Sequence, residues 1–403
     1  MNAKPIGPIP PHYGGQAALE IAGRSATDWA GAGTPLYLYD LAAVQARIAR
    51  FRAAMPAQVA LHYAIKANPF SPLIAAIAPQ VDGIDVASAG EMAKALAVLP
   101  ATTISFAGPG KRDAELEAAI RAGVTLNLES EGEAERALAI GERTGIAPRL
   151  AVRVNPDFEL RGSGMKMGGR ASPFGIDAAR VPVLIRRLIA AGADWRGFHI
   201  YAGSQALSAE AVIETQSATI GLAARLADAA GARPPLVNLG GGFGIPYFPG
   251  DASLDVEAVG AALASELERL DTYYAIELGR WLVGEAGIYL ARVIDRKESQ
   301  GETFLVVDGG LNHHLAATGN FGTVVRRNYP VAVAHRMHDA AEEVVTIVGP
   351  LCTPLDRLAD RVALPRAEVG DLIAIFASGA YGASASPQGF LGHPPVRELL
   401  AGN

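Results

Sequence analysis

Between about residues 36 and 284 the chain alternates short apolar segments with longer amphipathic ones. The short segments are rich in apolar and β-branched residues, so they predict strands. The longer segments are Ala-rich and predict helices, and those at 131–145, 178–192 and 208–231 end near a glycine, which is common just past a helix C-terminus. The strands predicted in this way are 59–65, 83–87, 103–107, 124–128, 149–155, 195–201, 236–240 and 273–278.

The alternation of predicted strands and helices indicates the fold class. Eight strand-helix units of roughly 30 residues each favour an α/β fold, a (β/α)8 barrel over residues 36–284. An open, doubly wound sheet stays possible, because periodicity does not show whether a sheet closes. After residue 284 the strands are separated by turns, so residues 285–403, together with 1–35, are assigned to a β-rich second domain.

Composition narrows the class of protein. Half of the 403 residues are hydrophobic and 19% are charged, which is typical of a globular enzyme and argues against disorder or a fibre. The net charge of -6, with scattered Lys and Arg, argues against a nucleic-acid partner. The N-terminal region has prolines where a signal peptide needs an apolar core, and no apolar run reaches the ~20 residues of a membrane span. We expect a soluble, cytoplasmic protein with a small-molecule ligand.

Metal and disulfide chemistry are not expected. Cys352 is the single cysteine, which excludes an internal disulfide and an all-cysteine metal site. His313 and His314 are adjacent, so in a strand they would point to opposite faces, and no carboxylate-supported ligand spacing accompanies them.

Unusual polar residues fall at the predicted strand ends, where a barrel of this kind builds its active site. Lys66 ends the first strand, which we expect to be buried. Burial would lower the pKa of its amine and make it a nucleophile, although a lysine reaching out of a strand end is the simpler alternative. The other strand-end residues are Asp85, Arg153, His199 and Glu277.

Two further segments carry chemistry. The loop 238–244, with sequence NLGGGFG, follows the seventh strand, where backbone N–H groups often bind phosphate, although a plain tight turn has the same composition. In ELGR, residues 277–280, Glu277 can face a ring nitrogen and Arg280 a phosphate, unless the two form a structural ion pair. An amine, a phosphate cradle and a carboxylate together predict a pyridoxal phosphate site, with Lys66 forming the Schiff base.

The chain resembles the fold-type III pyridoxal-phosphate decarboxylases, which include ornithine, arginine and diaminopimelate decarboxylases. Six motifs occur in the family's order from about residue 35 to the C-terminus: YAIKAN, FHIYAGSQ, GGGFG, ELGR, GPLCTPLD and GAYG. The resemblance implies that Lys66 holds the cofactor, His199 stacks on its ring and Glu277 pairs with its nitrogen. It further implies that Asp85 and Arg153 support the ring and its histidine, and that the phosphate is bound by Ser204, Gly241, Gly242, Gly279, Arg280 and Tyr381.

The resemblance also implies an assembly and a proton donor. Family members are homodimers with shared active sites, and Cys352 would reach into the partner's site. There the thiol, or a water that it positions, would return a proton after CO2 has left.

Departures from the family's motifs bear on the substrate. Thr353 stands where diamine-forming members carry an acidic residue, and a neutral hydroxyl cannot pair with a distal ammonium. The Arg-Pro-x-Leu-Tyr segment of diaminopimelate decarboxylases is missing from residues 308–330. Residues 163–177 and 379–399 instead resemble a subgroup associated with exosortase-type loci, akin to decarboxylases of carrier-protein-linked amino acids. The sequence therefore predicts decarboxylation of an amino acid that is carrier-linked or otherwise modified.

Three alternatives remain open at this point. One is diaminopimelate decarboxylation in lysine biosynthesis. A second is an amino-acid racemase on the same barrel, which Glu277 disfavours because racemases of this fold face the ring nitrogen with arginine. A third is a non-catalytic protein that binds the cofactor or a protein partner, against which Lys66, Cys352 and the β-rich domain all count.

Overall fold

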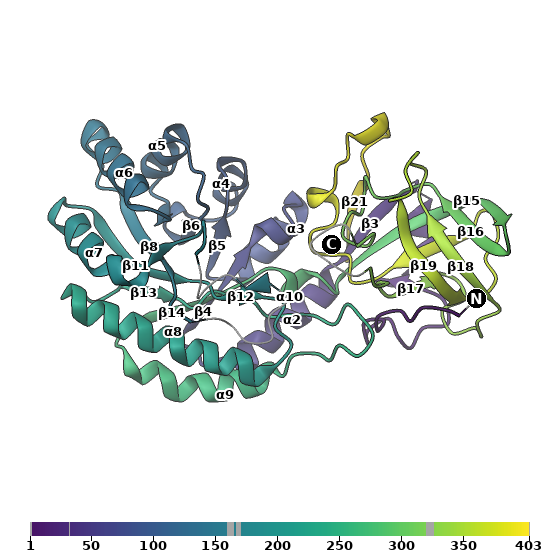
Figure 1. Cartoon of the computed structure of the whole chain (residues 1–403), viewed down its shortest axis with the longest axis horizontal. Coiled ribbons are helices and arrows are strands. Elements are labelled where there is room, and N and C mark those ends of the chain that lie inside the picture. Colours follow the sequence, from purple (N-terminus) through teal and green to yellow (C-terminus); the bar gives the residue numbers. More distant parts are fainter. Residues whose placement is uncertain (1, 32, 159–164, 167–170, 320–325, 403) are drawn as a thin grey trace. The chain divides into compact units, whose positions relative to one another are not determined.

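The structure is a computed structural model that describes residues 2–31, 33–158, 165–166, 171–319 and 326–402. Eight parallel strands form a closed barrel, in which each strand pairs with the next along the chain and the last pairs with the first (Figure 1). The strands are β4 (Val59–Ala64), β5 (Gly83–Val86), β6 (Ile104–Phe106), β7 (Thr125–Leu128), β8 (Arg149–Asn155), β11 (Asp194–Ile200), β13 (Leu236–Asn238) and β14 (Tyr273–Leu278). All eight predicted strands are confirmed, and closure excludes the open sheet.

Helices follow the barrel strands and surround them in Figure 1. They are α3 (Ser71–Ile77), α4 (Ala89–Leu96), α5 (Asp113–Ala122), α6 (Glu131–Thr144), α7 (Val181–Ala190), α8 (Ala209–Ala230) and α9 (Val256–Glu266). Local signals explain their ends. The Ser88 and Ser130 hydroxyls accept backbone N–H groups of the first turns of α4 and α6, and Gly145 and Gly231 close α6 and α8 in the left-handed conformation. The three helices predicted at 131–145, 178–192 and 208–231 are confirmed.

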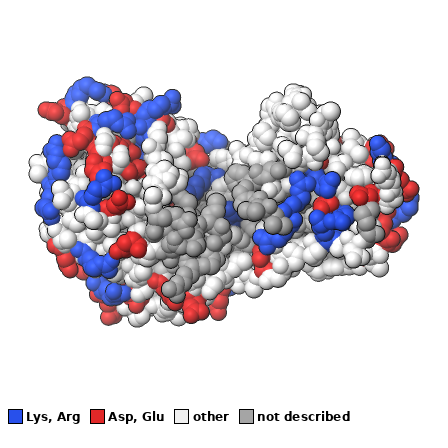
Figure 2. Space-filling view, in the orientation of Figure 1, with Lys and Arg blue, Asp and Glu red and all other residues white. Residues whose placement is uncertain are grey.

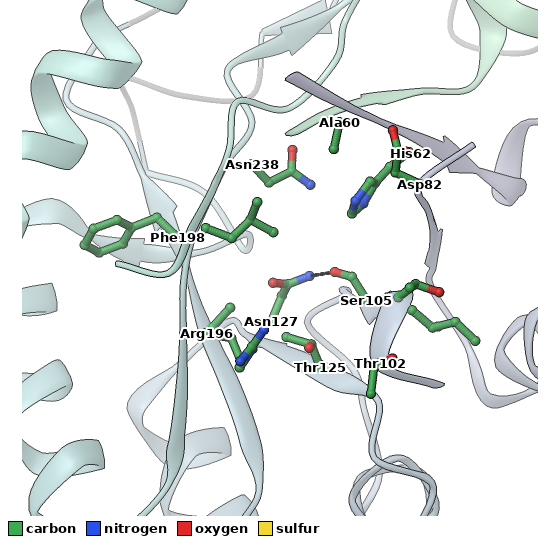
Figure 3. A pocket seen from close by; sticks show the side chains of 14 residues that line it. Ala60, His62, Asp82, Thr102, Ser105, Thr125, Asn127, Arg196, Phe198 and Asn238 are labelled. Atoms are coloured by element: carbon green, nitrogen blue, oxygen red, sulfur yellow. Dashed lines mark hydrogen bonds between the residues drawn. The ribbon is translucent and has the colours of Figure 1, made fainter. Parts of the chain in front are cut away.

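The barrel interior is partly polar and contains a cavity of about 180 Å³, whose lining side chains are drawn in Figure 3. Its walls include Ala60, Thr125 and Leu236, which lie at or near the first residues of their strands, so the cavity lies toward the N-terminal ends of the strands. Inside it, the Asn127 side-chain amide donates to Ser105 Oγ over 2.5 Å. Because this end is opposite the strand C-termini, we assign the cavity no part in catalysis.

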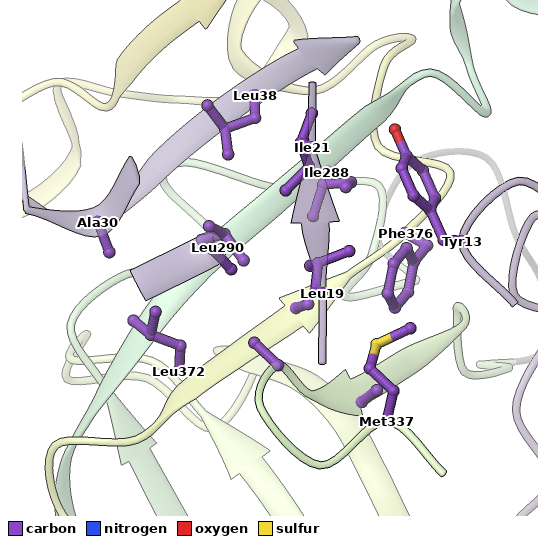
Figure 4. Packing of buried hydrophobic residues seen from close by; sticks show 14 of the residues in the cluster. Tyr13, Leu19, Ile21, Ala30, Leu38, Ile288, Leu290, Met337, Leu372 and Phe376 are labelled. Carbon is purple, nitrogen blue, oxygen red and sulfur yellow. The ribbon is translucent and has the colours of Figure 1, made fainter. Parts of the chain in front are cut away.

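A second, mostly antiparallel sheet has the strand order β17-β20-β15-β16-β18-β19, with β3 paired to β15 and β21 paired to β3. Its strands are β3 (Leu36–Asp40), β15 (Gly287–Ser299), β16 (Glu302–Val307), β17 (Val331–Val333), β18 (Glu343–Val348), β19 (Arg357–Leu364), β20 (Leu372–Ile375) and β21 (Arg397–Ala401). A hydrophobic core lies on this sheet, where Leu38, Ile288, Leu290 and Phe376 are all essentially inaccessible to solvent (Figure 4).

Shorter elements complete the chain. They are β1 (Glu20–Ile21), β2 (Arg24–Ser25), α1 (Ala26–Ala30), α2 (Leu41–Ala54), β9 (Met165–Lys166), β10 (Ile176–Asp177), β12 (Gly203–Ser204) and α10 (Arg280–Val283). In the part of the chain that the structure describes, no helix has both the length and the apolar character that crossing a membrane requires.

The chain divides into two compact units. One, the barrel unit, comprises residues 48–244 and 253–279, and the other, the β-rich unit, comprises 1–47, 245–252 and 280–403. The strand β3 begins the range 36–284 that the sequence assigned to the barrel, yet it pairs with β15 of the second sheet. An apolar run shows that a strand forms but not which strand it pairs with. The domain boundaries drawn from the sequence otherwise stay a prediction.

Candidate active site

Lys66 lies at the C-terminal end of a barrel strand, in a short 3-10 turn, Ile65–Ala67, that follows β4. The turn buries Ile65 and Ala67 and exposes the Lys66 side chain, so the prediction that this lysine is buried is wrong. The amine is instead accessible from solvent, with its Nζ 5.4 Å from the centroid of the Tyr201 ring. The turn packs closely against the loop after β14. A Cβ on Gly279 would lie only 2.8 Å from the Ala67 Cβ, so only glycine fits there.

Glu277 and His199 meet inside the barrel. Both side chains are almost fully buried, and His199 Nε2 lies 3.0 Å from Glu277 Oε2. The Asn238 side-chain amide also donates to Glu277 Oε2. Burial alone would raise the pKa of Glu277, but His199, followed by Lys66 and Arg153, outweighs burial and holds this pKa well below its usual value. Glu277 is therefore a fixed negative charge at neutral pH.

Two other barrel strands, β5 and β8, carry further buried charges. Asp85 Oδ2 lies 3.2 Å from Nδ1 of His62, and although burial lowers the pKa of His62, the Asp85 carboxylate raises it above its usual value. Arg153 donates to the buried carboxylate of Glu129 over 2.9 Å. The Arg153 guanidinium also lies 6.0 Å from the centroid of the Tyr201 ring. These groups form a charged layer beneath the strand ends.

The glycine loop after β13 packs against two other loops of the barrel unit. A Cβ on Gly241 would come within 1.9 Å of the Glu277 carbonyl oxygen, and one on Gly242 within 2.4 Å of the Gly203 carbonyl oxygen. Gly242 also has a φ of 84°, which side chains rarely tolerate. Beside this loop, the buried Ser204 hydroxyl has no hydrogen-bond partner among the described residues. An unpaired buried hydroxyl is costly unless a ligand satisfies it.

In the β-rich unit, Arg280 is positioned by aromatic rings. Its Nη1 donates to the Tyr247 hydroxyl over 2.8 Å, and its guanidinium lies 4.7 Å from the centroid of the Tyr381 ring. Tyr381 itself has a φ of 54°, a conformation that costs energy for a residue with a side chain and that is frequent at functional sites. The resemblance assigns both Arg280 and Tyr381 to the phosphate.

Cys352 lies on an exposed turn of the β-rich unit between β18 and β19. The carboxylate of Asp356 holds this turn by accepting the backbone N–H groups of Leu351 and Leu311. The thiol is thus presented on an ordered surface segment, and the simplest alternative, that Cys352 is a small buried apolar residue, is excluded.

His313 and His314 lie in turns, not in a strand, so the expectation that they point to opposite faces of a sheet does not apply. His313 contacts the Pro394 carbonyl oxygen through Nε2, and His314 contacts the Ser378 hydroxyl through Nε2. Both imidazoles are buried and have structural partners. The described residues contain no group of three or more His, Cys, Asp or Glu side chains placed to hold a metal.

Sequence reasoning missed Tyr201, which lies between Lys66 and Arg153 at the end of β11. Its position two residues after His199 in FHIYAGSQ is the signal that was available, because alternate residues of a strand share a face. His199 contacts Glu277 through the Nε2 edge of its ring, and the Tyr201 ring faces the exposed amine of Lys66. The ring-stacking role that the resemblance implies for His199 stays a prediction.

The residues present fit pyridoxal phosphate. The cofactor needs an amine for its aldehyde, a carboxylate for its ring nitrogen and donors for its phosphate. The barrel unit supplies the accessible Lys66 amine, the ionised Glu277 and the unpaired Ser204 hydroxyl beside a glycine loop.

Comparison with known proteins agrees with this chemistry. Residues 41–290 match the family described as pyridoxal-dependent decarboxylase, pyridoxal binding domain. The chain is 36% identical to the L-glutamyl-[BtrI acyl-carrier protein] decarboxylase of Niallia circulans over 92% of this chain and 89% of that protein. It is 32% identical to the 2-[(L-alanin-3-ylcarbamoyl)methyl]-2-hydroxybutanedioate decarboxylase of Staphylococcus aureus over 89% of this chain and 92% of that one.

A solved structure shares the whole architecture. The diaminopimelate decarboxylase of Helicobacter pylori, complexed with L-lysine, is 26% identical and superposes with a TM-score of 0.82 over 91% of each chain. The match in sequence covers more than half of the chain, and it includes the barrel and every barrel residue singled out above. The chain therefore belongs to the pyridoxal-dependent decarboxylases of the ornithine, arginine and diaminopimelate type, and it is a pyridoxal-phosphate-dependent amino-acid decarboxylase.

Proposed function

We propose that the chain decarboxylates an amino acid that is joined to a carrier protein through its side chain, with a glutamyl group as the first candidate. The observation that carries this proposal is the similarity to the carrier-linked glutamate decarboxylase of Niallia circulans, at 36% identity over nearly the whole chain. That relative's name states its substrate, and our proposal extends it to this chain.

The chemistry fixes where the carrier is attached. Pyridoxal phosphate acts on a free α-amino group, and decarboxylation needs a free α-carboxylate that can leave as CO2. Both α-groups of the substrate must therefore be unmodified, so a carrier can be attached only through the side chain. Among common amino acids, glutamate and aspartate carry a side-chain carboxyl group that forms a thioester directly.

The turn that carries Cys352 supports a substrate without a distal ammonium. Thr353 follows the cysteine, its hydroxyl accepts the Leu355 N–H over 3.4 Å, and it carries no charge. A substrate side chain that ends in a thioester is neutral and needs no acidic partner, whereas ornithine or lysine does. The lack of the Arg-Pro-x-Leu-Tyr segment points the same way, although part of its region, 320–325, lies outside the described residues.

Pyridoxal phosphate, when bound, supplies an electron sink for the electron pair that remains on the substrate's Cα after CO2 departs. We assign Lys66 the covalent attachment of the cofactor, since its amine is accessible at the barrel mouth. Glu277 would keep the ring nitrogen protonated, because a carboxylate with a depressed pKa stays negative beside it. His199 and Asn238 would orient Glu277 through their contacts with its Oε2.

Six residues are the candidates for binding the phosphate. Ser204, Gly241, Gly242 and Gly279 belong to the loops that follow the barrel strands, and the unpaired Ser204 hydroxyl supports this role. Arg280 and Tyr381 are the candidates from the β-rich unit. Asp85 and Arg153 would act indirectly, through His62 and through the Tyr201 ring.

Tyr201 offers the aromatic face that the cofactor's ring needs. Its ring lies beside the Lys66 amine, and His199 contacts Glu277 through a nitrogen at the edge of its ring, which leaves the ring's faces available. We therefore propose that Tyr201 contacts the cofactor's ring in addition to the stacking that the resemblance implies for His199. Stacked aromatic pairs contribute about 0.5–1.5 kcal/mol beyond the area that they bury, so the effect on cofactor affinity should be modest.

We further propose a homodimer in which Cys352 of one subunit completes the site of the other and delivers the proton to Cα. An exposed thiol and Leu355, which is 53% exposed, lie on the same ordered turn, as an interface segment would. Mixing inactive Lys66→Ala and Cys352→Ala subunits tests this arrangement. Shared sites predict recovery of about a quarter of wild-type activity in the mixture, because half of the dimers carry one intact site. No recovery between subunits that are shown to exchange would refute shared sites.

The substrate itself is tested by CO2 release. We expect the wild-type holoenzyme to turn over a γ-linked glutamyl carrier thioester at least about 100-fold more efficiently than free glutamate, because binding energy from the remote carrier contributes to catalysis. Free glutamate, diaminopimelate, ornithine and lysine serve as comparison substrates. Turnover of diaminopimelate at the highest rate would overturn the proposal and would favour the diaminopimelate decarboxylase alternative.

A further inference from the structure

Three basic side chains of the β-rich unit surround one carboxylate. Lys4 Nζ, Arg357 Nη1 and Arg361 Nε lie 2.5, 3.0 and 3.7 Å from the oxygens of Asp360. The Asp360 side chain is 8% exposed, whereas those of the three cations are 35–38% exposed. One buried negative charge thus meets three positive ones, and the excess positive charge is directed toward solvent.

Two more arginines extend this cluster. Arg326 donates to the Leu355 carbonyl oxygen over 3.5 Å, and burial together with the nearby Arg357 lowers the pKa of its guanidinium. Arg327 is exposed, with its guanidinium 3.7 Å from the centroid of the Phe248 ring. Neither arginine has a carboxylate within 4.0 Å among the described residues, and the preceding stretch 320–325, NFGTVV, contains no acidic residue.

We call Lys4, Arg326, Arg327, Arg357 and Arg361 the basic patch. Several exposed arginines on the barrel unit are, in contrast, paired with acids. Arg50 pairs with Glu257, and Arg187 pairs with Glu135. The chain as a whole carries 35 Lys and Arg against 41 Asp and Glu, so the patch reverses the sign of the overall charge. In Figure 2, blue Lys and Arg side chains gather on part of the β-rich unit beside grey atoms.

The patch is connected to Arg280 by aromatic contacts within the same unit. Phe248, which Arg327 covers, meets the Tyr329 ring at a centroid distance of 5.9 Å, and Tyr329 meets Tyr247 at 4.8 Å. The Tyr247 hydroxyl in turn accepts the hydrogen bond of Arg280. A partner bound at the patch would therefore contact the same packed cluster that positions a candidate phosphate ligand.

We propose that the basic patch is the docking surface for an acidic carrier protein that delivers the substrate, an inference that rests on the proposed function. Charge complementarity favours this occupant, because matched patches accelerate encounter and fix orientation. A long polyanion such as nucleic acid is disfavoured, since the chain as a whole carries a net charge of -6. Glu302, which shares a cavity of about 220 Å³ with Arg361, marks one edge of the patch.

The test uses the variant Arg327→Glu, which leaves intact both the Asp360 cluster and the hydrogen bond from Arg326 to the turn that carries Cys352. The matched control is Arg233→Glu on the barrel unit, where the side chain is 62% exposed and the change in net charge is the same. Each holoenzyme is assayed with the glutamyl carrier thioester and with the same glutamyl thioester on pantetheine alone. Binding of the unloaded carrier protein is measured separately by fluorescence anisotropy at low and moderate salt.

For the patch variant we expect KM for the carrier substrate to rise about tenfold with kcat unchanged, and carrier binding to weaken by a similar factor. With the pantetheine substrate both constants should equal those of the wild type, and the control variant should match the wild type throughout. Equal constants for patch variant and wild type on the carrier substrate would overturn the docking surface but not the proposed function. No wild-type turnover of either thioester would instead refute the proposed function.

The same experiment also tests two other occupants of the basic patch, a second copy of this chain and a nucleic acid. If the patch variant dissociates into monomers in sedimentation while carrier binding by the wild type is absent, the patch is an interface between copies of this chain and the proposal is overturned. If the wild type binds a fluorescent oligonucleotide but not the carrier protein, the proposal is likewise overturned.

Discussion

The groups singled out above lie differently in the two units of this chain. In the barrel unit, Glu277, Arg153 and Lys111 are buried near the strand ends, where Glu277 lies 3.0 Å from His199 and the two cations each pair with a carboxylate. In the β-rich unit the core on the sheet is apolar (Figure 4), while Cys352 and the basic patch lie at the surface. This difference fits the proposed roles, in which the barrel unit holds buried charges for the cofactor and the β-rich unit contributes the exposed Cys352 and the basic patch.

The strongest test of the barrel's role is Lys66→Ala. Without its amine the chain cannot attach the cofactor, so we expect CO2 release to fall roughly 10⁴-fold or more and the absorbance band of lysine-bound cofactor to disappear. Lys94→Ala is the matched control, because Lys94 is also exposed and donates to the Pro69 carbonyl oxygen. A band that persists in Lys66→Ala would remove Lys66 from this role.

The second prediction concerns the buried charges of the barrel. Lys111 Nζ donates to Glu133 Oε1 over 2.6 Å, and both side chains are 1% exposed. Lys111→Met leaves Glu133 buried without a cation, so we expect the free energy of unfolding to fall by about 3–5 kcal/mol. In the double variant Lys111→Met/Glu133→Leu much of that loss should be recovered, as denaturant titration would show. A double variant as unstable as the single one would mean that the ion pair itself stabilises the barrel.

The β-rich unit should respond instead to the loss of apolar volume. Leu290 is fully buried in its core, so Leu290→Ala should lower the free energy of unfolding by about 3 kcal/mol. Val369→Ala, at a side chain of the same unit that is 59% exposed, is the control and should change it by less than about 0.5 kcal/mol. A small effect at Leu290 would indicate that this unit does not depend on its apolar core.

One buried histidine gives the β-rich unit a dependence on pH. Burial lowers the pKa of His314 to about 3 from its usual 6.5, and the Ala317 N–H donates to His314 Nδ1, which fits a neutral ring. Because the folded state holds this pKa below its unfolded value, protonation of His314 favours the unfolded state. The free energy of unfolding is therefore highest above pH 6.5 and decreases as the pH falls toward 3. We expect a loss of about 2 kcal/mol between pH 7 and 5 in the wild type and a smaller one in His314→Asn. Equal pH dependence in the two proteins would exclude His314 as the cause.

The smallest expected effect is at Tyr201. Tyr201→Leu removes the aromatic face, so the dissociation constant of the cofactor should rise by up to about tenfold and the spectrum of the bound cofactor should shift. Tyr201→Phe keeps the face and should bind as the wild type does. If His199→Asn changes the spectrum while Tyr201→Leu does not, stacking belongs to His199 as the resemblance implies.

Much of the fold was predictable because it rests on local signals. Short apolar segments between glycine-terminated helices predicted all eight barrel strands. Each strand begins and ends within about one residue of the expected range, except β13, which is shorter. For the β-rich unit the sequence predicted strands separated by turns after residue 284, but it did not single out the short β17 or the edge strand β21. Their segments are too short or too polar to show a strand pattern.

By itself the sequence determined that an amine, a glycine loop and a carboxylate follow successive barrel strands, since residue order and periodicity place groups along the chain. Only the tertiary structure decided which way they point and what they meet. It turned Lys66 out to solvent, brought His199 to Glu277, gave Tyr201 the place beside the amine and gathered five cations from three distant segments. Those outcomes depend on packing between residues far apart in the chain, which no local pattern encodes.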